Sequence, residues 1–311
     1  MFMRFTQRGP ALTVERVRDN PVVAVAPWTW RDREAGTPCL VRIGGRIELL
    51  CHGHFGGRDR IGRLTAAVAG FCGTGFAESG SNPVLDTGAG GTADDLRVRY
   101  PSVVERAGVM YCFYEGRDER GSSHVCAAVS RDGSRWAKYP RNPLFPGCEP
   151  SAIVTDRGFV VLHTRPGAHA GIWAADSADG TEWTVSPAAV FGPGAPGSWD
   201  GGRVGSPRIH AEQGVYYLFY AGWREGAEWP EGIGLAMSQD LRRWRRWPGN
   251  PLVVRGGSAD WDGGGIWPGG ALRLEDVLYL PYEGLGFARL TASPPQVGML
   301  VLRGCLPRPV V

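Results

Sequence analysis

The side chains of this sequence that could do chemistry stand at matching places in a repeated pattern. One set lies directly before a recurring Pro or Gly and comprises Thr37, Tyr100, Glu149, Ser206 and Pro268. A second set flanks a later recurring position and comprises His52, His54, Glu115, Arg117, Asp118, His163, Arg165, His169, Trp223, Arg224, Glu225 and Glu283. Carboxyl, imidazole and phenol groups could transfer protons, and arginines could hold an anion.

The elements that must position these residues follow from the repeat itself. Its two marks are 15 residues apart in each of five copies, as Pro38 and Gly53, Pro101 and Gly116, Pro150 and Arg165, Pro207 and Gly222, and Gly269 and Gly284. The copies follow one another at intervals of 49 to 63 residues and contain apolar runs separated by turns. That length suits four short antiparallel strands, so we predict an all-β fold, a five-bladed β-propeller.

Two smaller motifs mark the outer part of each repeat. Ser-x-Asp-Gly-x-x-Trp occupies 130–136 and 177–183, and 238–244 matches it with Leu241 in place of Gly. We read it as a turn in which Asp caps its own backbone, Gly takes a positive φ and Trp packs between blades. Asn-Pro then closes a unit at residues 20–21, 82–83, 142–143 and 250–251, with Ser186-Pro187 as a variant.

The first Asn-Pro precedes any complete unit, whereas the fifth unit lacks an outer strand. Residues 11–17 could supply that strand, so that the N-terminal strand closes the ring within the last blade. Closure would remove exposed sheet edges. We therefore expect residues 1–311 to form a single five-bladed β-propeller domain.

Composition excludes several classes of protein. A net charge of +3 does not favour nucleic acid, and no apolar run approaches the ~18 residues of a membrane span. The start lacks the apolar core of a signal peptide, and the seven cysteines are scattered. We expect a cytoplasmic protein with free thiols, no cofactor, and no nucleic-acid or membrane partner.

In a propeller blade the first strand lines the central channel, and the turn after the second strand reaches the same face. The two residue sets described above should therefore meet at one funnel, with four of the six histidines, His52, His54, His163 and His169, around it. These histidines could shuttle protons, bind a metal or simply form hydrogen bonds. The histidines do not show the close spacing that is typical of metal ligands, so the sequence does not decide whether a metal is bound.

The repeated motifs resemble those of the five-bladed propeller glycoside hydrolases, the group that includes arabinanases and β-xylosidases, invertases and levansucrases, and mannoside phosphorylases. The resemblance runs through Pro-Ser-Val-Val, Tyr-x-x-Phe-Tyr-x-Gly and Ser-x-Asp-Gly-x-x-Trp, and covers essentially the whole chain. It implies the fold more directly than the reaction, because these are scaffold motifs.

The resemblance also implies roles for individual residues. Glu149 matches the general acid, whereas Thr37 and Tyr100 occupy the places of a base and an orienting aspartate. A glycosidase normally needs two carboxyl groups, about 5 to 9.5 Å apart depending on mechanism. Asp32, Glu34 and Asp95, in loops that feed the same mouth, are the candidate substitutes for the base.

Three other acids fit a structural role better. Asp94, Asp200 and Asp262 each lie seven residues before an anchor, and repetition at equivalent sites favours a turn-forming function in every blade.

Tyr100 offers another chemistry. Its phenol could act as nucleophile or proton donor, while Arg97, Arg99, Arg165 and Arg208 hold a carboxylate or phosphate of the substrate. Alternatively, Tyr100 narrows the channel and hydrogen-bonds Glu149. Two further residues on the open face, Trp223 and Trp267, are candidate sugar platforms.

Three functions therefore remain open. The first is a glycoside hydrolase-like enzyme that uses Glu149 on a small intracellular glycoside or glycosylated metabolite. The second is a phosphorylase, or another atypical enzyme of specialised metabolism, that uses Tyr100, Arg and His on an anionic sugar. The third is a non-catalytic carbohydrate-binding propeller. A second carboxyl facing Glu149 would favour the first, and an anion site the second.

Overall fold

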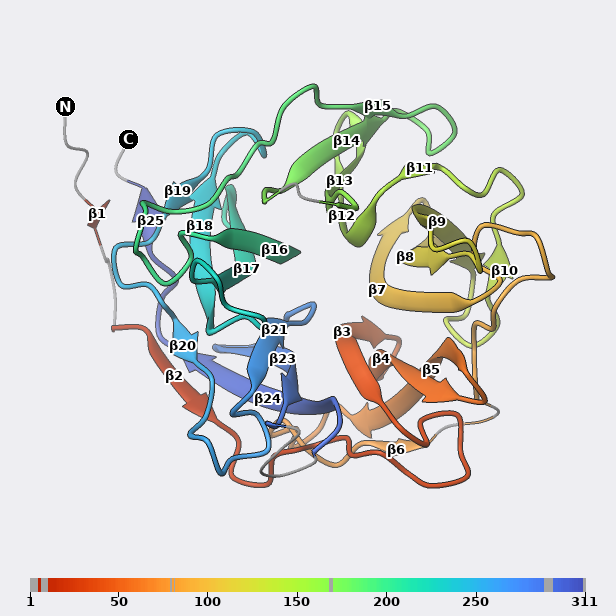
Figure 1. The fold of residues 1–311 in the computed structure, drawn as a ribbon, viewed down its shortest axis with the longest axis horizontal. Helices are drawn as coiled ribbons and strands as arrows, with labels where there is room; N and C mark the ends of the chain where they lie inside the picture. The colour runs from red at the N-terminus through yellow and green to blue at the C-terminus, as the bar shows by residue number, and fades with distance from the viewer. Residues whose placement is uncertain are drawn as a thin grey trace.

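The computed structural model describes residues 5–6, 11–78, 80, 82–167, 170–287 and 293–309 (Figure 1). Throughout these residues the chain forms β-strands and connecting turns, without a helix. Accordingly, no helix of the described part is long and apolar enough to cross a membrane. The prediction of an all-β fold built from antiparallel strands is confirmed.

The described strands fall into five groups, which we call units 1 to 5. Unit 1 contains β3 (Ala35–Ile43), β4 (Arg46–Phe55), β5 (Arg58–Ala67) and β6 (Ala77–Glu78). Unit 2 contains β7 (Arg97–Arg106), β8 (Val109–Arg117), β9 (Ser123–Ser130), β10 (Ala137–Lys138) and β11 (Phe145–Pro146). Unit 3 contains β12 (Cys148–Thr155), β13 (Gly158–Thr164), β14 (Trp173–Ser177) and β15 (Thr184–Val185).

The last two units follow the same order. Unit 4 contains β16 (Arg203–Glu212), β17 (Val215–Trp223), β18 (Gly232–Ser238), β19 (Arg245–Arg246) and β20 (Val253–Val254). Unit 5 contains β21 (Gly265–Pro268), β22 (Leu272–Leu274), β23 (Val277–Leu285), β24 (Gln296–Arg303) and β2 (Thr13–Arg16). A separate pair joins β1 (Phe5–Thr6) to β25 (Arg308–Pro309).

The units are arranged around a common centre, with β3, β7, β12, β16 and β21 innermost (Figure 1). Units 1 and 2 also share a parallel bridge between Asp59 and Arg97, which makes them one nine-stranded sheet. Strand β2 pairs with β24, from Thr13 opposite Arg303 to Arg16 opposite Leu300. The N-terminal segment therefore provides the outer strand of unit 5.

Hydrophobic clusters lie between neighbouring units and hold them together. Each cluster contains buried residues of two adjacent units, for example Leu50 and Tyr114, Phe113 and Phe159, Leu162 and Leu218, Phe219 and Leu280, and Tyr279 and Leu49. Each fully buried side chain of this size contributes about 1.5–3 kcal/mol. The innermost strands are thus fixed in position by packing on both sides of each unit.

The predicted Ser-x-Asp-Gly turns are confirmed. Gly133 has φ of 69° and its amide donates to Ser130 Oγ, while the Ser134 amide donates to Asp132. Trp136 Nε1 donates to the Gly133 carbonyl, and its ring packs against the cluster shared by units 1 and 2. Leu241, in the place of the Gly, adopts the same left-handed conformation with φ of 59°.

The Asn of each Asn-Pro pair fastens the outer chain to the third strand. Asn142 accepts from the Ala127 amide and donates to the Ala127 carbonyl, and Asn250 does the same with Leu235. Ser186 replaces this pair in unit 3 by accepting from the Ala174 amide. The side chain therefore imitates one rung of a β-ladder.

Asp94, Asp200 and Asp262 are structural in the same way in units 2, 4 and 5. Each accepts a hydrogen bond from a buried tyrosine of its own unit, namely Tyr114, Tyr220 and Tyr282. Each also pairs with a cation, namely Lys138, Arg246 and Arg16. The turn-forming interpretation of these three aspartates is supported, and the triads tie the inter-unit loops to the second strands.

The Asp–Tyr–cation triad predicts a measurable stability effect. Tyr220→Phe removes the hydroxyl that donates to Asp200 at 3.0 Å, and a buried carboxylate oxygen then loses a partner. We expect a loss of about 1 to 2 kcal/mol in the free energy of unfolding, measured by urea denaturation. The control is Tyr216→Phe on the same strand, where the ring is half-buried and the change should stay below about 0.5 kcal/mol. Equal effects in both variants would contradict the triad.

Candidate functional site

A bulge begins the first strand of units 1 to 4, at the four residues that the repeat places before a proline. The strand register shifts around Thr37, Tyr100, Glu149 and Ser206. All four have left-handed backbones, with φ between 46° and 55°. Such φ values are rare outside glycine and require stabilisation by the surroundings.

Hydrogen bonds between units supply that stabilisation. The Thr37 amide donates to Glu283, the Tyr100 amide to Thr37 Oγ1, the Glu149 amide to Glu115, and the Ser206 amide to Glu149. In each case a bulge amide of one unit meets a side chain of the preceding unit. The central polar residues are therefore built into the contacts between units.

A pocket of about 290 Å³ lies where these bulges meet. It is lined by Glu34, Arg99, Tyr100, Glu149, Arg203, Trp223, Glu228, Trp229, Trp267, Glu283, Leu285 and Pro295. A larger hollow of about 680 Å³ lies between units 3 and 4 and is lined by none of the predicted site residues. We place the candidate site in the smaller pocket because the carboxyl groups converge there.

Glu149 is buried and held by two donors. Its Oε2 accepts from Thr164 Oγ1 at 2.9 Å and from the Ser206 amide at 2.8 Å. Both bonds fall on the same oxygen, so the carboxyl is oriented while Oε1 stays available to a ligand in the pocket.

Glu283 and Glu115 provide carboxyl groups whose pKa is raised by burial. Burial raises the pKa of Glu283, although the neighbouring His52 imidazole and the hydrogen bond from the Thr37 amide oppose the shift. Burial and the nearby charge of Glu149 raise the pKa of Glu115, which accepts from Ser123 Oγ at 3.0 Å. Both environments favour the protonated acid.

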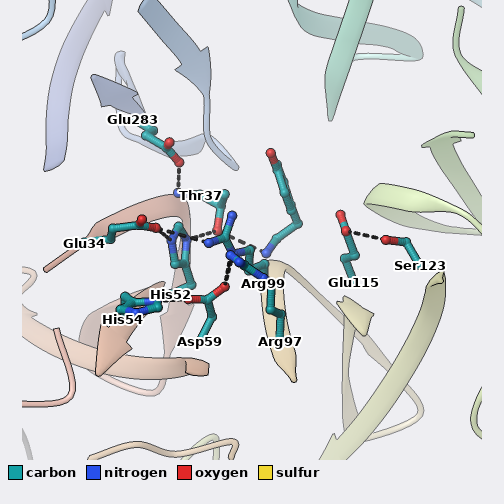
Figure 2. Close-up of polar contacts among 11 residues, drawn as sticks. Glu34, Thr37, His52, His54, Asp59, Arg97, Arg99, Glu115, Ser123 and Glu283 are labelled. Atoms are coloured by element: carbon teal, nitrogen blue, oxygen red, sulfur yellow. Dashed lines mark hydrogen bonds and ion pairs between the residues drawn. The ribbon is translucent and has the colours of Figure 1, made fainter. Parts of the chain in front are cut away.

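Glu34 lies in the opposite environment. Its Oε2 is 3.3 Å from His52 Nε2 and 3.1 Å from Arg99 Nη2 (Figure 2). Burial opposes ionisation, but the contact with His52 and the charge of Arg99 lower the pKa of Glu34 overall. The pocket therefore combines Glu34, whose pKa is lowered, with Glu283, whose pKa is raised, and a separation of pKa values between carboxyl groups is what acid–base catalysis needs.

Asp59 contacts the basic residues beside Glu34 and is the main residue that the sequence analysis missed. It is fully buried, pairs with Arg97 at 3.0 Å and with Arg99, and lies 2.6 Å from His54 Nδ1. Burial opposes its ionisation, but the charge of Arg99 and these hydrogen bonds hold the pKa of Asp59 below its usual range. The sequence signal that could have pointed to Asp59 is its position next to Arg58 at the start of β5.

Glu34, His54 and Asp59 are also the residues that could hold a metal ion, since one ligand atom of each lies within 4.8 Å of the others. Two arginines already neutralise Asp59, and Arg99 also contacts Glu34. The positive charge that a cation would bring is thus supplied by the chain itself.

An aromatic wall closes another side of the pocket. Trp223 and Trp267 are largely buried, whereas Trp229 is 41% exposed and meets Trp267 edge-on. Arg203 lies over the Trp223 ring at 4.6 Å. Trp229, Arg203 and Glu228 come from loop or strand positions that the repeat does not mark, which is why the sequence pattern did not select them as pocket residues.

Tyr100 lines the pocket, and its ring lies beside the Arg208 guanidinium. The Arg208 guanidinium is fully buried 5.7 Å from the Tyr100 ring and donates to the carbonyls of Pro150 and Pro268. Burial and the charges of Glu149 and Glu283 raise the pKa of Tyr100 well above its ordinary value. The phenol is therefore neutral, and Tyr100 joins the ring of bulges through its backbone amide, which donates to Thr37 Oγ1.

Several predicted site residues lie away from the pocket. Asp32 and Asp95 accept from the backbone amides of Trp28, Gly91 and Glu119, and so stabilise loops. Arg117 is exposed, and Asp118 accepts from the Ser122 amide in a turn.

His163 and Arg165 also point elsewhere, and this corrects the prediction that they share the funnel. His163 packs on Phe145 beneath the surface, and burial lowers its pKa to about 4. Arg165 stacks over Trp173 at 4.9 Å. His169 lies outside the described residues. Both side chains thus contact aromatic rings that do not line the pocket.

Comparisons with solved structures show which known proteins share this fold. A putative glycosidase from Bacteroides thetaiotaomicron matches with a TM-score of 0.74 and 17% identity, over 92% of this chain and 96% of the other. The β-1,2-mannobiose phosphorylase of Listeria innocua, in complex with β-1,2-mannobiose, matches with a TM-score of 0.73 and 14% identity, over 93% and 96%. The chain shares the glycoside hydrolase fold. The resemblance predicted from the sequence motifs is thereby confirmed for the fold.

A third structure belongs to the GH130 family of mannoside phosphorylases, which contains glycoside hydrolases that target β-1,2-mannosidic linkages. It matches with a TM-score of 0.72 and 17% identity, over 93% of each chain. No protein-family model matches this sequence. An uncharacterized protein of Mycobacterium tuberculosis is 28% identical over 163 residues, which are 47% of this chain and 52% of that protein. The chain thus spans about half the length of this relative.

The two kinds of buried carboxyl predict opposite pH dependences of stability. The folded-state pKa of Asp59 is lowered, so its stabilising contribution is complete above the unfolded-state value of about 3.9 and is lost as pH falls. Asp59→Asn should therefore flatten the acid side of the stability curve. It should also cost about 3 kcal/mol at neutral pH, because Arg97 and Arg99 lose a buried partner.

Glu283→Gln provides the contrast. The folded-state pKa of Glu283 is raised, so its contribution is complete below the unfolded-state value of about 4.3 and is lost as pH rises. The glutamine amide does not ionise, so the variant does not lose stability in this way as pH rises. Relative to the parent chain, the variant should therefore gain more stability at pH 7 than at pH 4. Urea denaturation between pH 3 and 8 measures both effects, and parallel curves for the two variants would refute the assignment.

Proposed function

We propose that the five units are the blades of a closed five-bladed propeller whose central pocket cleaves a glycosidic bond. The pairing of β2 with β24 and the clusters at five junctions support the closed ring. The observation that carries the function is that Glu149 shares one pocket with the carboxyl groups of Glu34 and Glu283. A second carboxyl is the feature that distinguishes a glycosidase from a residual binding scaffold.

In this proposal Glu149 is the general acid and Glu34 the base or nucleophile. Glu149 donates a proton from Oε1 to the leaving oxygen, since its Oε2 is occupied by Thr164 and Ser206. Glu34 is kept ionised by His52 and Arg99 and can activate water or attack the anomeric carbon. Glu34 thereby supplies the carboxylate that Thr37 cannot.

The lining favours a small glycoside. A pocket of about 290 Å³ lies at the lower end of the range for small-molecule sites. Trp223, Trp229 and Trp267 offer apolar faces to sugar rings, and the glutamates accept hydrogen bonds from hydroxyl groups. Because two of the similar structures concern β-1,2-mannosides, β-mannosides are the first substrates to test. Buried free thiols at Cys39, Cys51, Cys112 and Cys126 support a reducing, intracellular setting.

Phosphorolysis is the second candidate. Arg203 and Arg99 both reach the pocket, and one of the similar structures is a phosphorylase. Arg203 stacks on Trp223 and could turn its guanidinium to a phosphate that replaces water as the nucleophile. Inorganic phosphate in the assay separates the two reactions, since phosphorolysis yields a sugar phosphate and hydrolysis a free sugar.

The acid assignment is tested with two substrates of different leaving-group strength. Glu149→Gln keeps the shape of the side chain and removes its proton, so kcat should fall about 10²–10⁴-fold on β-1,2-mannobiose. The loss should be much smaller on an aryl β-mannoside, because an aryl oxide leaves without protonation. Glu283→Gln is the matched comparison, and a larger leaving-group effect there would transfer the acid role to Glu283.

The role of Glu34 has its own assay. Glu34→Ala should abolish hydrolysis of the aryl glycoside, and added azide should restore turnover by entering the vacated space and forming a glycosyl azide. Glu228 lies on the exposed rim of the same pocket. Glu228→Ala should change KM, and its turnover should not depend on azide. If the parent chain is stabilised by the sugars but turns over neither, with or without phosphate, the protein is a carbohydrate-binding propeller instead.

A further inference from the structure

Thr37 is the hub of a buried network that ends at the pocket. Its amide donates to Glu283 Oε2 at 2.8 Å, and its Oγ1 accepts from the Tyr100 amide at 3.0 Å. The same Oγ1 lies 2.9 Å from His52 Nδ1, whose other ring nitrogen lies 3.3 Å from Glu34. Thr37 and His52 are 3% and 1% exposed, so water does not compete for these contacts.

Counting donors and acceptors fixes the state of the His52 ring. Thr37 Oγ1 already accepts from the Tyr100 amide, and its own hydrogen must find an acceptor in a buried place. His52 Nδ1 is that acceptor if it carries no proton. The neutral imidazole then has its proton on Nε2, where it is donated to Glu34.

The reverse tautomer fails the same count. With the proton on Nδ1, the Thr37 hydroxyl would lose its acceptor, and the lone pair of Nε2 would face the Glu34 carboxylate at 3.3 Å. A buried hydroxyl without a partner and two opposed acceptors are both costly.

We propose that Thr37 and His52 are positioning residues: the Thr37 hydroxyl holds His52 in the Nε2–H tautomer, and that N–H holds the Glu34 carboxylate toward the pocket. The catalytic consequence rests on the proposed function, but the tautomer and its effect on Glu34 do not. The hydroxyl, imidazole and carboxylate form a relay of the kind that orients bases in hydrolases, here with the carboxylate at the open end.

The other charged groups around Glu34 act with the relay. Arg99 contacts it from β7, and Asp59 on β5 with Arg97 and His54 complete that side. Glu283 faces Glu34 from β23, and the charge of Glu34 contributes to raising the pKa of Glu283. Arg99 alone does not set the direction of the Glu34 carboxylate, because its guanidinium also pairs with Asp59. The His52 N–H is thus the donor that sets the direction of the carboxylate.

Nitrogen NMR on the whole chain tests the tautomer without any substrate. With ¹⁵N-labelled histidine, the His52 signals are identified by their absence in His52→Asn. We expect a neutral ring at pH 7 with the proton on Nε2 and with Nδ1 as a hydrogen-bond acceptor. A neutral ring protonated on Nδ1, or a doubly protonated ring, would overturn the proposal whether or not the protein is an enzyme.

Paired variants then test the positioning role. The amide nitrogen of Gln can take the place of Nε2, whereas that of Asn takes the place of Nδ1 only. His52→Gln should therefore leave the Glu34 pKa, followed by ¹³C-labelled glutamate, near that of the parent. His52→Asn and Thr37→Val should raise it by about one pH unit, and Thr37→Ser should restore it.

If the proposed reaction is real, the acid limb of kcat/KM moves by the same amount in the same variants. His210→Asn, which removes a 3.3 Å contact to Glu212 at the far end of β16, is the control and should move neither readout. Equal Glu34 pKa values in His52→Asn and the parent would refute the role of the relay. A shifted Glu34 pKa without turnover on any glycoside would refute the proposed function and leave the relay standing.

Discussion

The bulge at the start of the innermost strand in units 1 to 4 is the constraint on which the site depends. A left-handed residue followed by proline cannot continue the strand ladder, so its amide turns from its own unit toward the preceding one. Thr37, Tyr100, Glu149 and Ser206 all do this, and each amide finds a side-chain acceptor there. Packing between the units must hold these strained positions, so the same contacts stabilise the fold and aim the polar groups.

The ring of bulges also separates the carboxyl groups by environment. Glu149 and Glu283 each accept a bulge amide, whereas Glu34 lies outside the ring and is met by an imidazole and a guanidinium. Burial raises the pKa of Glu283. The contact of Glu34 with His52 and the charge of Arg99 lower the pKa of Glu34. One small pocket can therefore present both a proton donor and a carboxylate at the same pH.

The sequence predicted the parts of the molecule that repeat. The four bulge residues, the Ser-x-Asp-Gly turns and the structural aspartates such as Asp200 all recur, and each lies where equivalent copies require it. The pocket, in contrast, depends on what differs between copies. Asp59, Arg203 and Glu228 have no repeated counterpart that marks them. Near the end of β13 His163 packs on Phe145, and Arg165, just after the strand, stacks over Trp173. Spacing locates a residue on a strand, but it does not determine which way an irregular loop carries its side chain.

Thr37 and Glu34 divide between them two roles, a hydrogen-bonding group at a strained position and a negative charge beside the pocket. A charged group at a bulge needs compensating donors, whereas a hydroxyl can donate and accept in the same place. Here the hydroxyl accepts the Tyr100 amide and meets His52, and the negative charge lies three residues earlier, on Glu34, within reach of Arg99. Because Asp59 pairs with Arg99 as well, the guanidinium that contacts Glu34 is held from two sides. The geometry thus separates two tasks that a single aspartate would otherwise combine, namely bridging the bulges and carrying the charge.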